Sequence, residues 1–163
     1  MPDEAPPKPA VRISIQVNPN APTERDSAEL LALAEEAIAQ APVPVAISAG
    51  ELARLAGRTF YGKQLRAAEW PAGVDREAVE TLMHHIKRWD DWPRRHLQLM
   101  DAEEWADHVR LTVERPCCQM ARDLAKRKLA GYEAERVPLA GCWQERCRCR
   151  YEVVSKRLAG KHR

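Results

Sequence analysis

The sequence predicts a mainly helical α+β protein, and three observations support this class. Apolar residues recur at helical spacing through the middle of the chain, between residues 75 and 113. Near the N-terminus they alternate with polar residues over residues 11–17, as in a half-buried strand, and form a short apolar run over residues 43–47. They alternate again in the C-terminal segment CRCRYEVV, residues 147–154. At 163 residues, with 45% hydrophobic and 31% charged residues, the chain suits one domain with an apolar core and a small appendage.

The two small N-terminal strands are expected behind a flexible, proline-rich tail over residues 1–10. The first strand covers residues 11–17, where valine and isoleucine occupy every second position. The second strand covers VPVAI, residues 43–47. Because proline cannot donate to a sheet, Pro44 places this second strand at an edge.

Three helices are indicated by N-capping side chains that precede apolar residues at helical spacing. Asp26 precedes the first helix, Ser48 the second and Asp75 the third. The segment DDWP, residues 90–93, is expected to end the third helix, because the residue before a proline disfavours the helical conformation.

Two further helices are expected before the C-terminal strand. The first begins at Asp101, places Trp105 and Val109 inward, and ends at Pro116. The second runs from about Cys117 to Ala130 and is followed by a glycine.

Charge is divided unevenly along the chain, although the net charge is only +2. Residues 114–163 contain 13 Lys/Arg and 6 Asp/Glu, whereas residues 1–113 carry an excess of acidic side chains. We therefore expect a helical α+β domain over residues 11–113 and a basic, cysteine-rich module over residues 114–163 packed on it. The module suits an anionic protein surface or nucleic acid as its partner, with a merely solvated arginine-rich face as the alternative.

Several classes of protein are disfavoured by the sequence. No apolar run approaches the roughly 20 residues of a membrane-spanning helix, so we expect no membrane partner. The N-terminal stretch MPDEAPPKPA lacks the apolar core of a secretory signal, which favours a cytoplasmic location. The chain contains no GxSxG, Walker or GxGxxG motif, so an enzyme is not expected.

All the cysteines lie in the last third of the chain. They are Cys117, Cys118, Cys142, Cys147 and Cys149. Their odd number argues against a complete set of disulfides, and clustered cytoplasmic cysteines more often hold metal. Buried unliganded thiols, and a disulfide or redox pair, are the alternatives.

A zinc site follows from the spacing of these thiols. On a strand, Cys147 and Cys149 point to the same face, and the turn permitted by Gly141 brings Cys142 back over them. One thiolate from the pair at residues 117–118 completes the four soft ligands that structural zinc prefers. We therefore expect zinc as a structural cofactor.

The same module carries the candidate partner-binding residues. Its cationic side chains suit phosphate or carboxylate groups, and its indole suits stacking on a base, anchoring a protein partner or covering the metal. The set is Lys126, Arg127, Lys128, Trp143, Arg146, Arg148 and Arg150. Outside the module, His84 and His85 are adjacent on a helix, point about 100° apart, and are expected to be a surface or core-edge pair.

The order of motifs in the C-terminal segment resembles the tail of phage Mu F-like minor head proteins. The corresponding pieces are Cys117–Cys118, LAG at 129–131, Val137–Pro138–Leu139 and Cys147–Arg148–Cys149. Such tails carry two spaced cysteines and a histidine before the CRC, where this chain has adjacent cysteines and Gly141–Cys142. The ending GC-x4-CRCRY is also similar to endings of uncharacterised small bacterial proteins.

The sequence therefore predicts a non-enzymatic interaction or assembly protein with a zinc-stapled basic module at its C-terminus. A nucleic-acid-binding accessory or regulatory protein is one alternative. A phage-derived head morphogenesis factor, which the resemblance implies, is the other.

Overall fold

The computed structural model describes residue 18 and residues 20–159, so the expected tail and the strand over residues 11–17 lie outside it. Helices and strands follow in the order α1 (Ser27–Gln40), α2 (Ala49–Thr59), α3 (Arg76–Asp101), β1 (Ala106–Thr112), α4 (Gln119–Leu124), β2 (Arg150–Ser155) and α5 (Lys156–Ala159). Short 3-10 turns are η1 (Ala67–Glu69), η2 (Ala102–Glu104) and η3 (Gly131–Glu133). The predicted α+β class, with cysteines gathered in the C-terminal region, is confirmed.

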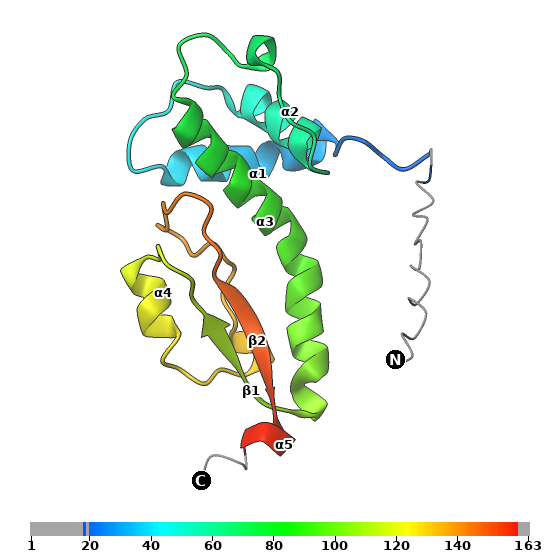
Figure 1. The fold of residues 1–163 in the computed structure, drawn as a ribbon, viewed down its shortest axis with the longest axis vertical. Helices are drawn as coiled ribbons and strands as arrows, with labels where there is room; N and C mark the ends of the chain where they lie inside the picture. The colour runs from blue at the N-terminus through cyan, green and yellow to red at the C-terminus, as the bar shows by residue number, and fades with distance from the viewer. Residues whose placement is uncertain (1–17, 19, 160–163) are drawn as a thin grey trace, which may run out of the picture.

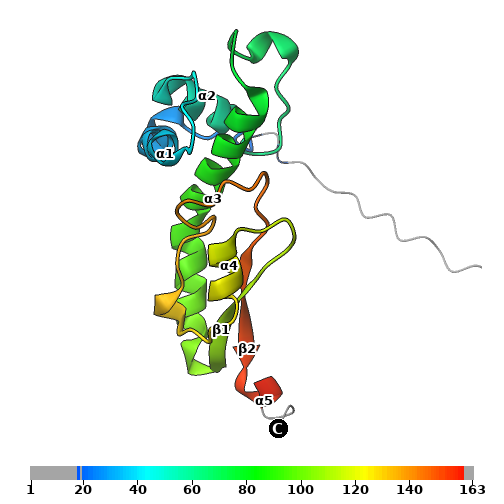
Figure 2. The ribbon, with the colours of Figure 1, turned by 90° about the vertical axis from the view of Figure 1, so that its left-hand side faces the viewer.

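Helix α3 runs along most of the length of the molecule, and the other elements lie beside it (Figure 1). Helices α1 and α2 pack around its N-terminal end, and the β1–β2 sheet with α4 lies beside its C-terminal part, as the view in Figure 2 also shows. None of the helices within the described residues is both long enough and apolar enough to cross a lipid bilayer.

The three predicted N-caps are confirmed by hydrogen bonds. The Asp26 carboxylate accepts from the Ala28 amide at 2.9 Å, the Ser48 hydroxyl from the Glu51 amide at 3.2 Å, and the Asp75 carboxylate from the Ala78 amide at 3.3 Å. Each bond satisfies an amide that the first helical turn leaves unpaired. These caps fix where α1, α2 and α3 begin.

The predicted end of the third helix at residues 90–93 is wrong, because α3 continues through Pro93 to Asp101. Proline removes one backbone hydrogen bond inside a helix. Here Pro93 is exposed, while Trp89 before it and Leu99 after it are buried. Packing of both halves against the core outweighs the local cost.

The helix predicted from Asp101 to Pro116 is also wrong, because residues 106–112 form strand β1. The apolar residues fit helical spacing, but Val109 and Leu111 also alternate with polar neighbours, and the strand pattern prevails. Trp105, expected inside, is 54% exposed. Strand β1 pairs antiparallel with β2, with Val109 opposite Val153 and Leu111 opposite Tyr151. The partner strand lies about forty residues away in the chain, which is why local spacing misassigns the segment.

Two other predicted elements are altered. Residues 43–47 form no strand: the chain bends there, and the Ile47 amide donates to the Val45 carbonyl at 2.8 Å instead of to a neighbouring strand. Prolines on either side of Val43 remove the donors that a sheet needs. The helix expected over residues 117–130 is only α4, after which Leu129 forms a bridge with Val109.

Buried side chains form two clusters along α3. The first joins α1, α2 and the first half of α3, from Leu30 to Trp89. The second joins Leu99 of α3, β1, α4 and the loops that hold three of the cysteines. The division falls within α3, and β1 packs with the C-terminal module although it precedes residue 114.

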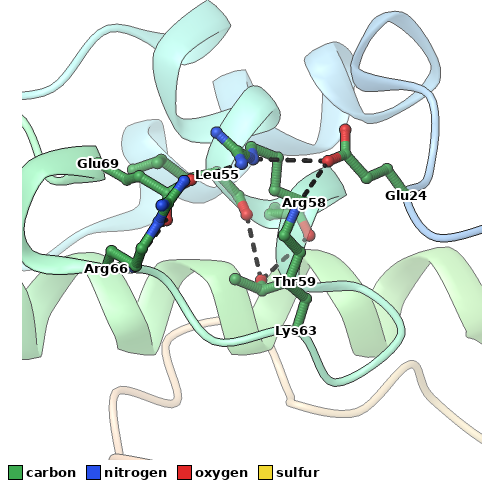
Figure 3. A network of polar contacts seen from close by, with 8 residues as sticks. Glu24, Leu55, Arg58, Thr59, Lys63, Arg66 and Glu69 are labelled. Atoms are coloured by element: carbon green, nitrogen blue, oxygen red, sulfur yellow. Dashed lines mark hydrogen bonds and ion pairs between the residues drawn. The ribbon is translucent and has the colours of Figure 1, made fainter.

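The end of α2 is tied to the chain on both sides of it (Figure 3). The Arg58 guanidinium contacts Glu69 at 2.5 Å and Glu24 at 3.5 Å, and Lys63 reaches Glu24 at 3.1 Å. At Gly57 the backbones meet directly, because the Arg25 amide donates to its carbonyl at 3.0 Å. This approach brings α1 into place against α2.

The replacement Gly57→Ala is expected to destabilise the protein by about 1–3 kcal/mol, because a Cβ there would lie 2.5 Å from the Arg25 carbonyl oxygen. In the same helix, a Cβ at Gly50 meets nothing within 4 Å, so Gly50→Ala is expected to be neutral or to stabilise by up to about 1 kcal/mol. Urea unfolding of both variants measures the difference. Equal stability of the two would contradict the close approach.

Candidate functional site

The five cysteines come from two loops on the same side of α3. Cys117 and Cys118 precede α4, and the other three lie on the loop that leads into β2. Cys142, Cys147 and Cys149 are almost completely buried, at 2%, 2% and 1% exposed. All five are free thiols. The predicted turn at Gly141 is present, with φ of 76°, and the Cys142 amide closes it onto the Leu139 carbonyl at 2.9 Å.

Three of the thiols interact directly through their sulfur atoms. A hydrogen bond with Cys142 lowers the pKa of the Cys147 thiol, and the nearby Arg88 charge lowers it further. The same hydrogen bond raises the pKa of Cys142. Burial raises the pKa of Cys149, and its closeness to Cys147 adds to the rise. The arrangement therefore favours one thiolate, at Cys147, flanked by two thiols.

The pair at residues 117–118 lies at the edge of this group. Charge on Cys118 contributes to raising the pKa of both Cys142 and Cys149, and charge on Cys117 contributes to raising that of Cys149. The Cys118 sulfur also accepts from the Ala121 amide at 3.4 Å as the N-cap of α4. Within the described residues, no three His, Cys, Asp or Glu side chains are already arranged as a metal site.

One turn of α3 holds the cysteine loop by its backbone. His84 donates to the Cys147 carbonyl at 2.9 Å. The Arg88 guanidinium donates to the same carbonyl at 2.6 Å and to the Cys149 carbonyl at 2.5 Å. Burial lowers the pKa of Arg88 and of His84, because both side chains lie where water is scarce. Hydrogen bonds are stronger in such a place.

The neighbouring face of the same turn holds the start of the loop. His85, 1% exposed, lies between the Cys142 carbonyl at 2.6 Å and the Thr81 carbonyl at 2.8 Å. The Trp89 indole donates to the Pro138 carbonyl at 2.9 Å.

Trp143 packs its ring on His85, with the ring centres 5.0 Å apart and 17° between the planes. Its other neighbours include the bend at residues 41–45, with which it lines a cavity of about 510 Å³. The indole thus covers the buried histidine, and joins the cysteine loop to the first cluster of buried residues.

The predicted cationic residues are exposed but spread over several elements. Lys126 and Arg127 lie in the turn after α4, with Lys128 next to them, whereas the three arginines lie on the cysteine loop and at the start of β2. Most have a carboxylate nearby: Lys126 pairs with Asp123 at 2.9 Å, and Arg150 with Glu114 at 2.6 Å. Arg146 and Arg148 make looser contacts, at 3.6 Å and 3.9 Å, and are 69% and 71% exposed.

The residues that sequence reasoning missed are the donors on α3. The run HHIKRW places residues 84 and 88, and residues 85 and 89, four apart, so each pair shares a helix face. The sequence offers one signal for these donors: they are polar side chains on a helix face that continues the buried apolar stripe through Val79 and Ile86. The expectation of a surface or core-edge pair fits His84, which is half-buried, but not His85, which is 1% exposed; the carbonyl partners of both on the cysteine loop are not local in sequence.

Comparison with protein-family models, curated proteins and solved structures gives no match to this chain. The resemblance of the C-terminal segment to Mu F-like head proteins therefore stays a prediction from its motifs. Function has to be argued from the cysteine loop and its surroundings.

The replacement Arg88→Met is expected to destabilise the protein by about 2 kcal/mol, because it leaves the Cys149 carbonyl without its side-chain donor and the Cys147 carbonyl with His84 alone. Arg94→Met is the matched control on the same helix: Arg94 is 64% exposed and its ion pair among the described residues is with Asp91, so its loss is expected to cost less than about 1 kcal/mol. Urea unfolding of the two variants measures the costs. A cost for Arg88 no larger than for Arg94 would show that the guanidinium does not hold the loop.

Proposed function

We propose that the protein is a non-enzymatic interaction protein whose C-terminal module is fixed by one structural zinc ion and docks an anionic partner. The observation that carries the proposal is the convergence of free thiols from two loops beside the half-buried Arg88. Zinc in structural sites takes four thiolate or imidazole ligands. The chain supplies enough sulfur atoms for that set without using a histidine.

Cys142, Cys147 and Cys149 are the first three ligands in this proposal, because their thiols already interact with one another. Cys118 is the fourth, since its charge acts on two of the three. Its bond from the Ala121 amide is compatible with this role, because metal thiolates commonly accept backbone N–H bonds that orient them. Cys117 is then the spare thiol.

Charge supports the same ligand set. Four thiolates around Zn²⁺ leave two negative charges, which are costly to bury without compensation. The Arg88 guanidinium lies beside Cys147 and Cys149 and makes no ion pair with a carboxylate among the described residues. Its positive charge offsets part of the excess. The ion would join the loop before α4 to the loop before β2, where there is little regular secondary structure to connect them.

The zinc proposal predicts that the purified protein carries about one zinc per chain, and that a chelator lowers its melting temperature by about 10 °C or more. Cys149→Ser and Cys118→Ser are expected to lose the metal. Cys117→Ser, next in the chain, is expected to keep it. Elemental analysis with thermal melting measures all of these. A wild-type protein free of zinc, with a melting point unchanged by chelator, would rule the site out.

Docking of an anionic partner rests on the charge of the module and the exposure of its arginines. Arg146 and Arg148 lie on the proposed zinc loop, and their exposed contacts with Glu145 and Glu114 are weak enough to be exchanged for a partner's. Arg146 has a left-handed backbone, φ 48°, which is rare for a residue with a side chain and fixes the direction in which the loop presents it.

The double variant Arg146→Gln/Arg148→Gln is expected to weaken binding to polyglutamate, and the loss should shrink as salt is raised. Arg66→Gln, on an 84% exposed side chain remote from the module in sequence, is the control. A 20-base-pair DNA duplex serves as the second probe. Tighter binding to the duplex than to polyglutamate, with a salt slope reduced by about 2 in the double variant, would favour the nucleic-acid alternative. Unchanged binding of both probes would remove these arginines from any docking surface.

A further inference from the structure

A cavity of about 450 Å³ lies between α3 and β2, and Arg88 is one of the residues that line it. Its α3 wall is built from positions three or four residues apart, so they share one helix face. Its β2 wall comes from alternate positions 151 and 153, which share one face of the strand. The volume falls in the range of small-molecule sites, roughly 300–1,000 Å³.

We propose that this groove binds a planar organic anion, that is, an aromatic ring bearing one phosphate or carboxylate group. The inference does not depend on the zinc ion or on the docking arginines at residues 146 and 148. It rests on two independent features of the lining, its aromatic walls and its excess of cations.

Aromatic and apolar side chains form the walls and floor. The Trp92 and Tyr151 rings have their centres 5.9 Å apart and are tilted by 49°, so they do not fill the space by stacking on each other. Leu99, Val137 and Val153 complete the apolar surface. A flat ring that enters this space contacts both aromatic and apolar side chains.

The rim is cationic. Lys87, Arg88, Arg95 and Arg150 line the cavity, and Asp91 is the one carboxylate in that lining. Asp91 is already occupied, because it accepts from Arg94 at 2.6 Å and from Arg95 at 3.2 Å. An anionic group at the rim therefore meets more positive than negative charge.

Two of these cations lack a carboxylate of their own among the described residues. Lys87 donates to the Thr59 carbonyl at 3.0 Å, and Arg88 donates only to carbonyls of the cysteine loop. Burial lowers the pKa of Lys87, which reflects the cost of a positive charge in a poorly hydrated place. A ligand anion would offset that cost, whereas a neutral ring would not.

The test uses the full chain and measures binding by isothermal titration with 2-naphthoate, adenosine 5′-monophosphate and the neutral 2-naphthalenemethanol. At least one of the two anions is expected to saturate with a dissociation constant below about 1 mM, and the neutral ring is expected to bind at least about tenfold more weakly than naphthoate. The ratio of the two anion constants shows whether carboxylate or phosphate is preferred.

Arg95→Gln and Arg94→Gln are the decisive variants. Both arginines are exposed, at 62% and 64%, and both contact Asp91, but only Arg95 lines the cavity. Binding is expected to weaken about tenfold in Arg95→Gln and to change less than about twofold in Arg94→Gln. No saturable binding of either anion, equal binding of the neutral ring, or equal effects of the two variants would each overturn the proposal.

Discussion

The structure depends on a single turn of α3 whose side chains donate to the backbone of a distant loop. The carbonyls belong to residues 138–149, which lie 49 to 63 residues after their donors in the chain; the donors are His84, His85, Arg88 and Trp89. A loop without regular secondary structure leaves its carbonyls unpaired, and burying them unpaired is costly. Donors from a rigid helix remove that cost and hold the loop that carries Cys142, Cys147 and Cys149.

The same contacts explain why polar residues occur where a core would be expected. His85 is buried and Arg88 half-buried where α3 meets the cysteine loop, and Trp143 closes over His85. Their hydrogen bonds join the clusters more specifically than apolar contacts would, because each donor reaches its carbonyl in only one arrangement of the loop. Arg88 serves both sides: it holds the Cys147 and Cys149 carbonyls, and it brings a positive charge to the thiols.

Sequence patterns predicted those features of the structure that depend on residues close together in the chain. The caps at Asp26, Ser48 and Asp75 start helices as expected, because a cap and its amide lie within three residues. The strand at Val109 was mistaken for a helix, since the strand that pairs with it begins only at residue 150. Pro93 was expected to stop α3, but burial of Trp89 and Leu99 on both sides of it decides otherwise. Grouping of the cysteines followed from their spacing, whereas the role of Arg88 depends on carbonyls that no local pattern reveals.

The central claim is that the α3 contacts bring the thiols of Cys118, Cys142, Cys147 and Cys149 around one ion. X-ray absorption at the zinc edge of the purified protein tests it most directly. Four sulfur neighbours at about 2.3 Å, with no nitrogen or oxygen shell near 2.0 Å, is the predicted spectrum. A zinc shell made of nitrogen and oxygen would place the ion elsewhere on the protein and contradict the account.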